Sequence, residues 1–372
     1  MHQHSSKKAP ARNASAEKGS VLIIVLWTAV LLTVLVTAMA GKVRLSAQTV
    51  VHNQEVSGSW AELMGTLHQA EMELMLEMMA VPVDQELELT EEGEVRNPRF
   101  RFNGQPLKLH YPQSEDFVVR VYDHAGKINL NRIPRRNMQM LIEKRLGGLN
   151  ADPEEVQDLL SAWTDWTDLN DLEGLNGAEE EYYQSLEPGY TPRNNPELDT
   201  VEEVLHIRGF ADLFEGVNLD AAFTIYGNNR TVNLNLATRE ALELLPGLDE
   251  ELIENILAFR EREDINNRAE VAEIVPFENL QELSAWIGTN TSQIYSVFVY
   301  PRSDLDEEML LTLAENQDFV NPDPVTQAYM EVVEARAYTS LPRIYKIDPY
   351  GYLPDTGPPR VHPEDYLFPT SY

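Results

Sequence analysis

The chain has 372 residues, of which 43% are hydrophobic, and it carries five tryptophans, fifteen tyrosines and eleven phenylalanines. This composition predicts packed cores, with room for two or more domains, rather than a disordered chain. The formal net charge of −32 argues against nucleic acid as a partner, because an acidic surface repels phosphate groups. No cysteine is present, which excludes disulfide bonds and thiolate chemistry.

Residues 21–40 form an uninterrupted run of twenty uncharged, almost wholly apolar residues. A helix of this length spans about 30 Å, the thickness of the hydrocarbon core of a bilayer. The leader before it carries four lysines and arginines against one acid, so the positive-inside rule places the leader in the cytoplasm. The sequence therefore predicts a single membrane crossing with the remaining chain exported.

A secretory signal peptide is the alternative interpretation of this run. Ala38, Met39 and Ala40 before Gly41 resemble a signal-peptide cleavage site. The run is longer than the apolar region of most signal peptides, and no proline follows it until Pro82, so we expect the helix to continue. In the alternative, the mature protein would begin at Gly41 and be a secreted calcium-dependent binding protein.

Beyond the membrane run, apolar residues recur at intervals of three and four. This spacing puts them on one helical face, which predicts packing against a partner surface. The stripe consists of Val56, Trp60, Leu63, Met64, Leu67, Leu74 and Met78.

After Pro82 the pattern changes to that of an α+β protein. Residues 117–123 are rich in valine and tyrosine and predict a strand, whereas residues 128–288 have a helical pattern. Strands are expected again at 292–300, 328–339 and 342–347. The simplest topology is an α-helical domain inserted into a small antiparallel sheet that packs on the striped helix.

The helical region contains an internal repeat. Residues 128–131 and 232–235 share the pattern Ile/Val-Asn-Leu-Asn, and the similarity continues into the residues that follow. Asparagine favours turns and helix N-caps, so each copy is expected to mark the entrance to a helix. The second copy continues into residues 245–249, which resemble the turn of a helix-hairpin-helix. Acids from Asp249 onward exclude a good phosphate clamp, which favours a scaffold.

Residues 165–183 are rich in hard oxygen ligands. If Asp168 is position 1 of a calcium loop, Asn170 falls at position 3 and Glu179 at position 12, the place of the bidentate carboxylate. Positions 5 and 6 are Leu172 and Glu173, so the loop would be irregular. Spacing alone leaves a solvated acidic loop as the alternative.

Gly19, followed by an apolar run that continues into one long amphipathic helix, resembles the type IV pilin family. The resemblance implies that a prepilin peptidase cuts after Gly19, so that Ser20 is the first mature residue. Pilins usually carry a glutamate at the fifth mature position, where this chain has Ile24. Residues 19 to about 300 are similar to the minor pseudopilin K family of type II secretion in three features. These are the absence of this glutamate, the Asn-Leu-Asn repeat and the acidic loop.

This resemblance implies a pilin-like α+β fold in which a long N-terminal helix packs on a small antiparallel β-sheet that carries a large inserted α-helical domain. The expected segments are a leader at 1–19, the N-terminal helix at 20–81, β regions at 82–127 and 291–348, the helical domain at 128–290, and a proline-rich tail at 349–372.

The resemblance also implies one or two calcium ions in the helical domain. The expected ligands are Asp165, Asp168, Asn170, Asp171, Glu179 and Glu180, with Asp199, Glu202 and Glu203 as weaker candidates. Glycines at 174 and 177 are expected to allow tight turns in this loop.

The implied function is that of a minor pseudopilin at the pseudopilus tip, anchored in the bacterial inner membrane with a periplasmic ectodomain. Its expected partners are minor pseudopilins I and J and the prepilin peptidase. Because Ile24 cannot recruit an amino terminus above it, the subunit can cap a filament. No common catalytic motif is present, so we expect no enzyme; a membrane-anchored, metal-dependent periplasmic hydrolase is the rival.

Overall fold

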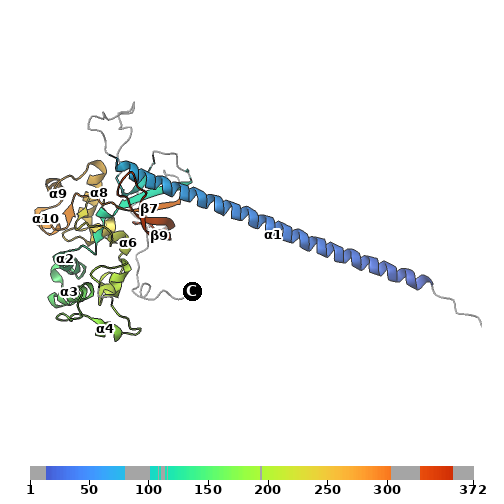
Figure 1. Cartoon of the computed structure of the whole chain (residues 1–372), viewed down its shortest axis with the longest axis horizontal. Coiled ribbons are helices and arrows are strands. Elements are labelled where there is room, and N and C mark those ends of the chain that lie inside the picture. Colours follow the sequence, from blue (N-terminus) through green and yellow to red (C-terminus); the bar gives the residue numbers. More distant parts are fainter. Residues whose placement is uncertain are drawn as a thin grey trace, which may run out of the picture. The chain divides into compact units, whose positions relative to one another are not determined.

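The computed structural model describes residues 14–79, 101–107, 109, 114, 116–192, 195–302 and 327–354. The chain divides into two compact units, Met1–Glu62 and Leu63–Tyr372. Helix α1 (Ala14–Glu77) supplies all the described structure of the first unit and continues into the second (Figure 1). Most of the predicted leader, Pro82, most of the connection at 301–327 and all but the first residues of the predicted tail lie outside the described residues.

The described part of the second unit contains a five-stranded antiparallel sheet in the order β1-β2-β7-β8-β9. Its strands are β1 (Asn103–Leu107), β2 (Phe117–Asp123), β7 (Ile294–Pro301), β8 (Gln327–Glu334) and β9 (Arg343–Tyr352). The prediction for β2 is confirmed with its bounds. Strand β1 was not predicted, since its short segment contains glycine and proline.

Three strands are confirmed with different ends. Strand β7 begins two residues later than expected, and β8 ends at Glu334 rather than at residue 339. Strand β9 continues to Tyr352, into the segment predicted as a tail. Pro349 suggested a loop, but it falls at an irregularity of the β8–β9 register, where a residue without an N–H is tolerated.

The C-terminal part of α1 packs on one face of the sheet, as the stripe predicted. Leu67, Ala70 and Leu74 are fully buried there against valines of β2 and β7, with Leu63, Met64 and Met78 at the margin. Burying a leucine side chain contributes about 2 kcal/mol, so these contacts hold the helix on the sheet. Val56 and Trp60, at the other end of the stripe, are exposed.

The helical insert lies between β2 and β7, as predicted, and in Figure 1 its helices form the body beside the sheet. Its ends are joined at Asp123, whose carboxylate accepts the Ser292 hydroxyl at 2.5 Å and the Ala125 amide at 2.8 Å. The insert consists of η1 (His124–Gly126), β3 (Ile128–Asn129), α2 (Arg135–Arg145), η2 (Gly148–Asn150), α3 (Pro153–Thr167), α4 (Glu180–Gln184), η3 (Glu202–His206), α5 (Phe210–Leu213), α6 (Leu219–Ala222), β4 (Phe223–Thr224), β5 (Val232–Asn233), α7 (Arg239–Leu244), α8 (Glu250–Arg262), α9 (Arg268–Ile274), α10 (Phe277–Leu283) and β6 (Ile287–Gly288).

The sequence repeat is a structural repeat. In each copy the first strand pairs in parallel with the last, β3 with β4 and β5 with β6. The Asn131 side chain accepts the Leu198 amide at 2.7 Å and donates to the Leu198 carbonyl at 3.1 Å. Asn235 makes the same two bonds to Ile265, each at 2.9 Å. These asparagines therefore brace distant backbone and do not cap the next helix.

The acidic loop is an addition to this repeat. In the second copy, α8 ends at Arg262 and Ile265 follows almost at once. In the first copy, the equivalent path from the end of α3 to Leu198 contains residues 168–197, including the acidic loop and α4. The second copy of the repeat has no counterpart of this segment, so any function of the acidic loop belongs to the first copy alone.

The predicted hairpin joins α7 to α8, with Gly247 at a φ of +76°. Asp249 caps α8 by accepting the Leu252 amide at 2.9 Å. The Lys144 ammonium donates to the carbonyls of Leu245 at 2.6 Å and Leu248 at 2.8 Å. A cation that could have met phosphate is thus bound to the hairpin itself, which supports the scaffold interpretation.

Candidate functional site

The acidic loop folds over the carboxylate of Asp165, which is buried on α3. This carboxylate accepts the amides of Gly174 at 3.1 Å and Ala178 at 2.9 Å. A Cβ on Gly177 would lie 1.7 Å from Oδ2 of Asp165, and one on Gly174 would lie 2.9 Å from Oδ1. Glycine is therefore needed at both positions, because the loop backbone lies so close to the Asp165 side chain. The left-handed residue of the loop is Asn176, at a φ of 55°.

A second set of contacts holds the loop from outside. Arg208 donates to the carbonyls of Gly177, at 2.6 Å, and Asn176. The Asn176 side chain in turn donates to Asp158 on α3 at 2.9 Å. Sequence reasoning missed Arg208, because an arginine that binds backbone carbonyls far along the chain has no local signature.

Glu179 has the most unusual environment in the loop. Its side chain is buried, with 7% of the residue exposed, and its Oε1 has no hydrogen-bond partner among the described residues. Burial raises the pKa of Glu179 to about 7, and the charges of Asp165, Asp168, Asp171 and Glu173 raise it in the same direction. A buried carboxylate among other acids is costly unless it is protonated or meets a cation.

The other predicted ligands lie nearer the surface. Asp168 accepts the Asn170 amide at 3.0 Å, and Asn170 accepts the Leu172 amide at 3.0 Å, so both side chains stabilise turns of the loop. Glu180 is exposed and accepts the Gln184 side chain at 2.5 Å. In the part of the chain that the structure describes, no three acidic or histidine side chains converge as a metal site.

The side chains of the acidic loop fit a calcium ion. Calcium prefers carboxylate, amide and backbone oxygens, which the loop supplies, and Glu179 offers a buried oxygen with no other partner. Of the predicted ligands, Asp165 already anchors the loop through both carboxylate oxygens. Asp168 and Asp171, whose charges act on Glu179, and Asn170 between them are the side chains that could join Glu179 in holding an ion.

The weaker candidates have other roles. Glu203 accepts the Trp166 indole at 3.1 Å and the Asp199 amide at 2.8 Å, which ties η3 to α3. Glu202 lies 3.9 Å from the Lys346 ammonium of β9. These contacts support the helical domain and join it to the sheet.

A known family model matches the first part of the helical insert. Residues 126–214, which include the first copy of the repeat up to α5 and the acidic loop, match the family model described as type II secretion system (T2SS), protein K. This segment is therefore similar to protein K of the type II secretion system. The match agrees with the resemblance inferred from the sequence over these residues.

One solved structure is similar to this chain. A chain of the GspK-GspI-GspJ complex from the type 2 secretion system of enterotoxigenic Escherichia coli aligns with a TM-score of 0.46 and 12% identity. The alignment covers 82% of this chain and 99% of that chain. The search of curated proteins gave no match.

The match to protein K favours neither a secreted calcium-dependent binding protein nor a metal-dependent hydrolase. In this chain, α1 is the one helix of the described residues that is long and apolar enough to cross a membrane, with a mean hydropathy of 2.8 over its most apolar stretch. That is consistent with a single-pass anchor and a periplasmic ectodomain.

In the apolar run of α1, polar side chains make hydrogen bonds within the helix itself. The hydroxyls of Thr28, Thr33 and Thr37 each donate at 2.8 Å to a carbonyl three or four residues earlier. Such bonds suit a helix in lipid, where water cannot supply partners. Gly19 and Ser20 lie within α1 just before Val21, and Ile24 is exposed on the helix surface.

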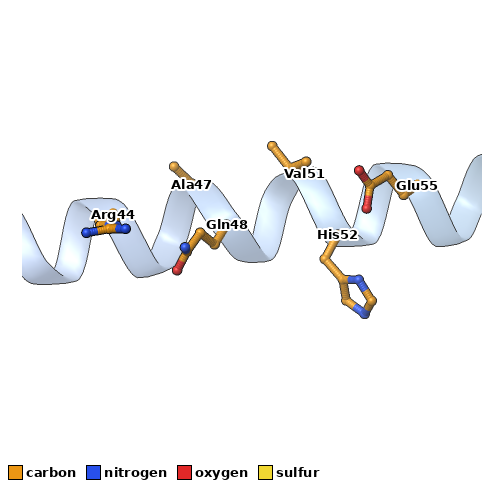
Figure 2. A pocket seen from close by; sticks show the side chains of 6 residues that line it. All are labelled: Arg44, Ala47, Gln48, Val51, His52 and Glu55. Atoms are coloured by element: carbon orange, nitrogen blue, oxygen red, sulfur yellow. The ribbon is translucent and has the colours of Figure 1, made fainter.

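Beyond the apolar run, α1 carries a mixed stripe, shown in Figure 2. It consists of Arg44, Ala47, Gln48, Val51, His52 and Glu55. Steps of three and four residues place all six on one side of a single helix. A surface of this kind accommodates another helix better than it encloses a small ligand.

Proposed function

We propose that this chain is a minor pseudopilin K of type II secretion that acts at the tip of the pseudopilus, where it initiates and caps assembly with minor pseudopilins I and J for protein export across the outer membrane. The observation that carries the proposal is the protein K domain lying between β2 and β7 of a sheet on which α1 packs. The same chain thus joins a membrane-length helix to a bulky periplasmic head.

The proposed mechanism is mechanical and has no covalent step of its own. Prepilin peptidase removes the leader after Gly19, and residues 21–40 hold the mature subunit in the inner membrane with its N-terminus toward the cytoplasm. The exposed side chains of the mixed stripe and of Val56 and Trp60 then pack against sister subunits. Ile24 provides no acid for a further subunit, and the helical insert blocks growth beyond it.

Two experiments test this proposal. Mass spectrometry of the protein from membranes is expected to find Ser20 as the first residue; a chain beginning at Gly41 would contradict it. Ile24→Glu is expected to reduce filament initiation and to place the subunit within filaments rather than at their ends, with Ile24→Leu as the control. Unchanged tip location in Ile24→Glu would refute the capping role.

We further propose that the acidic loop binds calcium. Asp168, Asn170, Asp171 and Glu179 would hold the ion, while Asp165 and Arg208 position the loop. The support is the buried, unpartnered oxygen of Glu179 and the acids around it. Bound calcium would neutralise these charges and fix the loop.

Calcium titration of the full chain in detergent, followed by melting temperature, tests the calcium proposal. We expect the melting temperature to rise with calcium for the natural protein and to stay constant for Glu179→Gln. Glu278→Gln, an exposed acid on α10, is the control and is expected to respond like the natural protein. A response retained in Glu179→Gln would exclude the loop as the calcium site.

A further inference from the structure

One row of side chains crosses β7, β8 and β9 on the face of the sheet that α1 packs against. The register places Val297 opposite Glu331 and Glu331 opposite Ile347, and directly opposed residues share a face. Val297 belongs to the core under α1, so Glu331 and Ile347 face the same side. Their exposed fractions are 0%, 3% and 51%, which shows that the cover ends between β8 and β9.

The neighbouring row of side chains shows the same change from buried on β8 to exposed on β9. Val333 of β8 is fully buried in the same core, whereas Ile344, opposite it on β9, is 46% exposed. Strand β9 ends the order of the sheet in the described residues and so presents two isoleucines on an uncovered strip beside α1. An apolar strip next to a long helix has the form of a packing surface for another protein segment.

A carboxylate lies at the inner edge of this strip. Glu331 Oε2 has no hydrogen-bond partner among the described residues, and Oε1 meets the Tyr329 hydroxyl only at 3.4 Å. Burial raises the pKa of Glu331, and so does the charge of Glu71 on α1, while His68 lowers it. Glu71 itself lies 2.9 Å from the His68 imidazole. A buried carboxylate with one oxygen unbonded and the other only weakly bonded weakens the free subunit, so it points to a positive group that arrives from outside.

We propose that Glu331, Glu71, Ile344 and Ile347 form a docking strip for a segment of a sister minor pseudopilin that places a lysine or arginine beside apolar side chains. The basic group would pair with Glu331, with Glu71 near it, and the apolar side chains would cover the two isoleucines. This inference rests on the proposed function, because it takes minor pseudopilins I and J as the source of the segment.

The charges and geometry favour this occupant over two others. The strip sets carboxylates beside two exposed isoleucines, so it suits a cation carried by a segment with apolar side chains of its own better than a free metal ion. A second copy of this chain is disfavoured by mutual repulsion, because the formal net charge is −32. Burial of an ion pair between an Arg or Lys and a carboxylate gives specificity to such an interface.

The test measures binding of the full chain in detergent to purified minor pseudopilins I and J of the same system. The variants are Glu331→Gln and Ile347→Ser, and their matched controls are Glu278→Gln and Phe277→Ser on the exposed surface of α10. We expect both strip variants to weaken binding at least tenfold and both controls to bind normally. Glu331→Gln should also raise the melting temperature of the free chain, because it removes a buried charge that no cation neutralises.

The second readout separates docking from folding. A residue needed only for the fold would lower the melting temperature and the affinity together, whereas a docking carboxylate gives a more stable and weaker-binding variant. Unchanged affinity in both strip variants, with normal binding by the natural chain, would overturn the docking strip and leave the proposed function intact. No binding of I or J by the natural chain would overturn both. Self-association lost in Ile347→Ser would assign the strip to a second copy and refute this proposal.

Discussion

The imidazole Nε2 of His124 lies 2.8 Å from the hydroxyl of Ser296, across the point where the helical insert leaves the sheet and returns to it. Its other ring nitrogen lies 2.7 Å from the Thr224 hydroxyl of β4. One buried side chain thereby joins the start of the insert to its first closing strand and to β7. Burial, together with the charges of Lys127 and Lys346, lowers the pKa of this histidine well below its usual value.

Replacing His124 with alanine should reduce the free energy of unfolding by about 2 to 4 kcal/mol, because two buried hydrogen bonds are lost and a cavity remains. The natural chain should also lose stability as the pH falls below about 6.5, since only the unfolded state then binds a proton at this histidine. His124→Ala should show a shallower acid dependence in denaturant melts at pH 5 to 8. The same dependence as the natural chain would contradict a neutral buried imidazole.

The raised pKa of Glu179 predicts the opposite pH dependence in the absence of calcium. Between about 4.5 and about 7 the folded state holds a proton that the unfolded state has released, so stability falls as the pH rises through this window. Glu179→Gln should remove this loss and be more stable than the natural chain at pH 8 by about 1 to 3 kcal/mol. The measurement is a pair of melts at pH 5 and pH 8 with chelator. An equal difference at both pH values would argue against the raised pKa.

Gly177→Ala tests the close approach between the loop and α3. The new methyl group would occupy the position of the Asp165 carboxylate, so we expect the loop to open and the stabilisation by calcium to be lost. Leu175→Ala, in the same loop but 81% exposed, is the control and should keep the response. Melting curves with and without calcium report both variants, and a normal calcium response in Gly177→Ala would show that the anchored geometry is dispensable.

Lys144→Met tests the hairpin as a scaffold. Removing the ammonium leaves the carbonyls of Leu245 and Leu248 without their donor, which should cost about 1 to 3 kcal/mol of stability. Lys42→Met on the exposed surface of α1 should leave stability unchanged. Chemical denaturation measures both effects. Equal stability of the Lys144 variant and the natural chain would mean that the hairpin keeps its conformation without this lysine.

Much of the fold could be predicted because it rests on local periodicity. The alternation of residues 117–123 gave β2 its bounds, and the stripe that includes Leu67 and Leu74 marked the part of α1 that packs on the sheet. Strand β1 and the end of β9 could not be predicted, because each depends on a neighbouring strand that supplies hydrogen bonds to a segment containing proline.

The candidate site, too, could be predicted only in part from the sequence. Sequence composition indicated that residues 165–183 are rich in oxygen donors, and the structure places Asp165, Asp168 and Asp171 where their charges act on Glu179. The roles within the set depend on tertiary contacts: Asp165 binds backbone amides, and Arg208 holds the loop from another element. Spacing along the chain contains no information about such contacts. Calcium binding itself stays a prediction.

The antiparallel pairing of β2 with β7 sets Asp123 directly opposite Tyr295, so the chain departs from one rung of the sheet and returns at the adjacent position. A short reverse turn could replace everything between these two points without altering the order or direction of any strand. The helical insert is in this sense a self-contained unit of the fold, so changes of length or sequence within it leave intact both the pairing of the five strands and the packing of α1 on them.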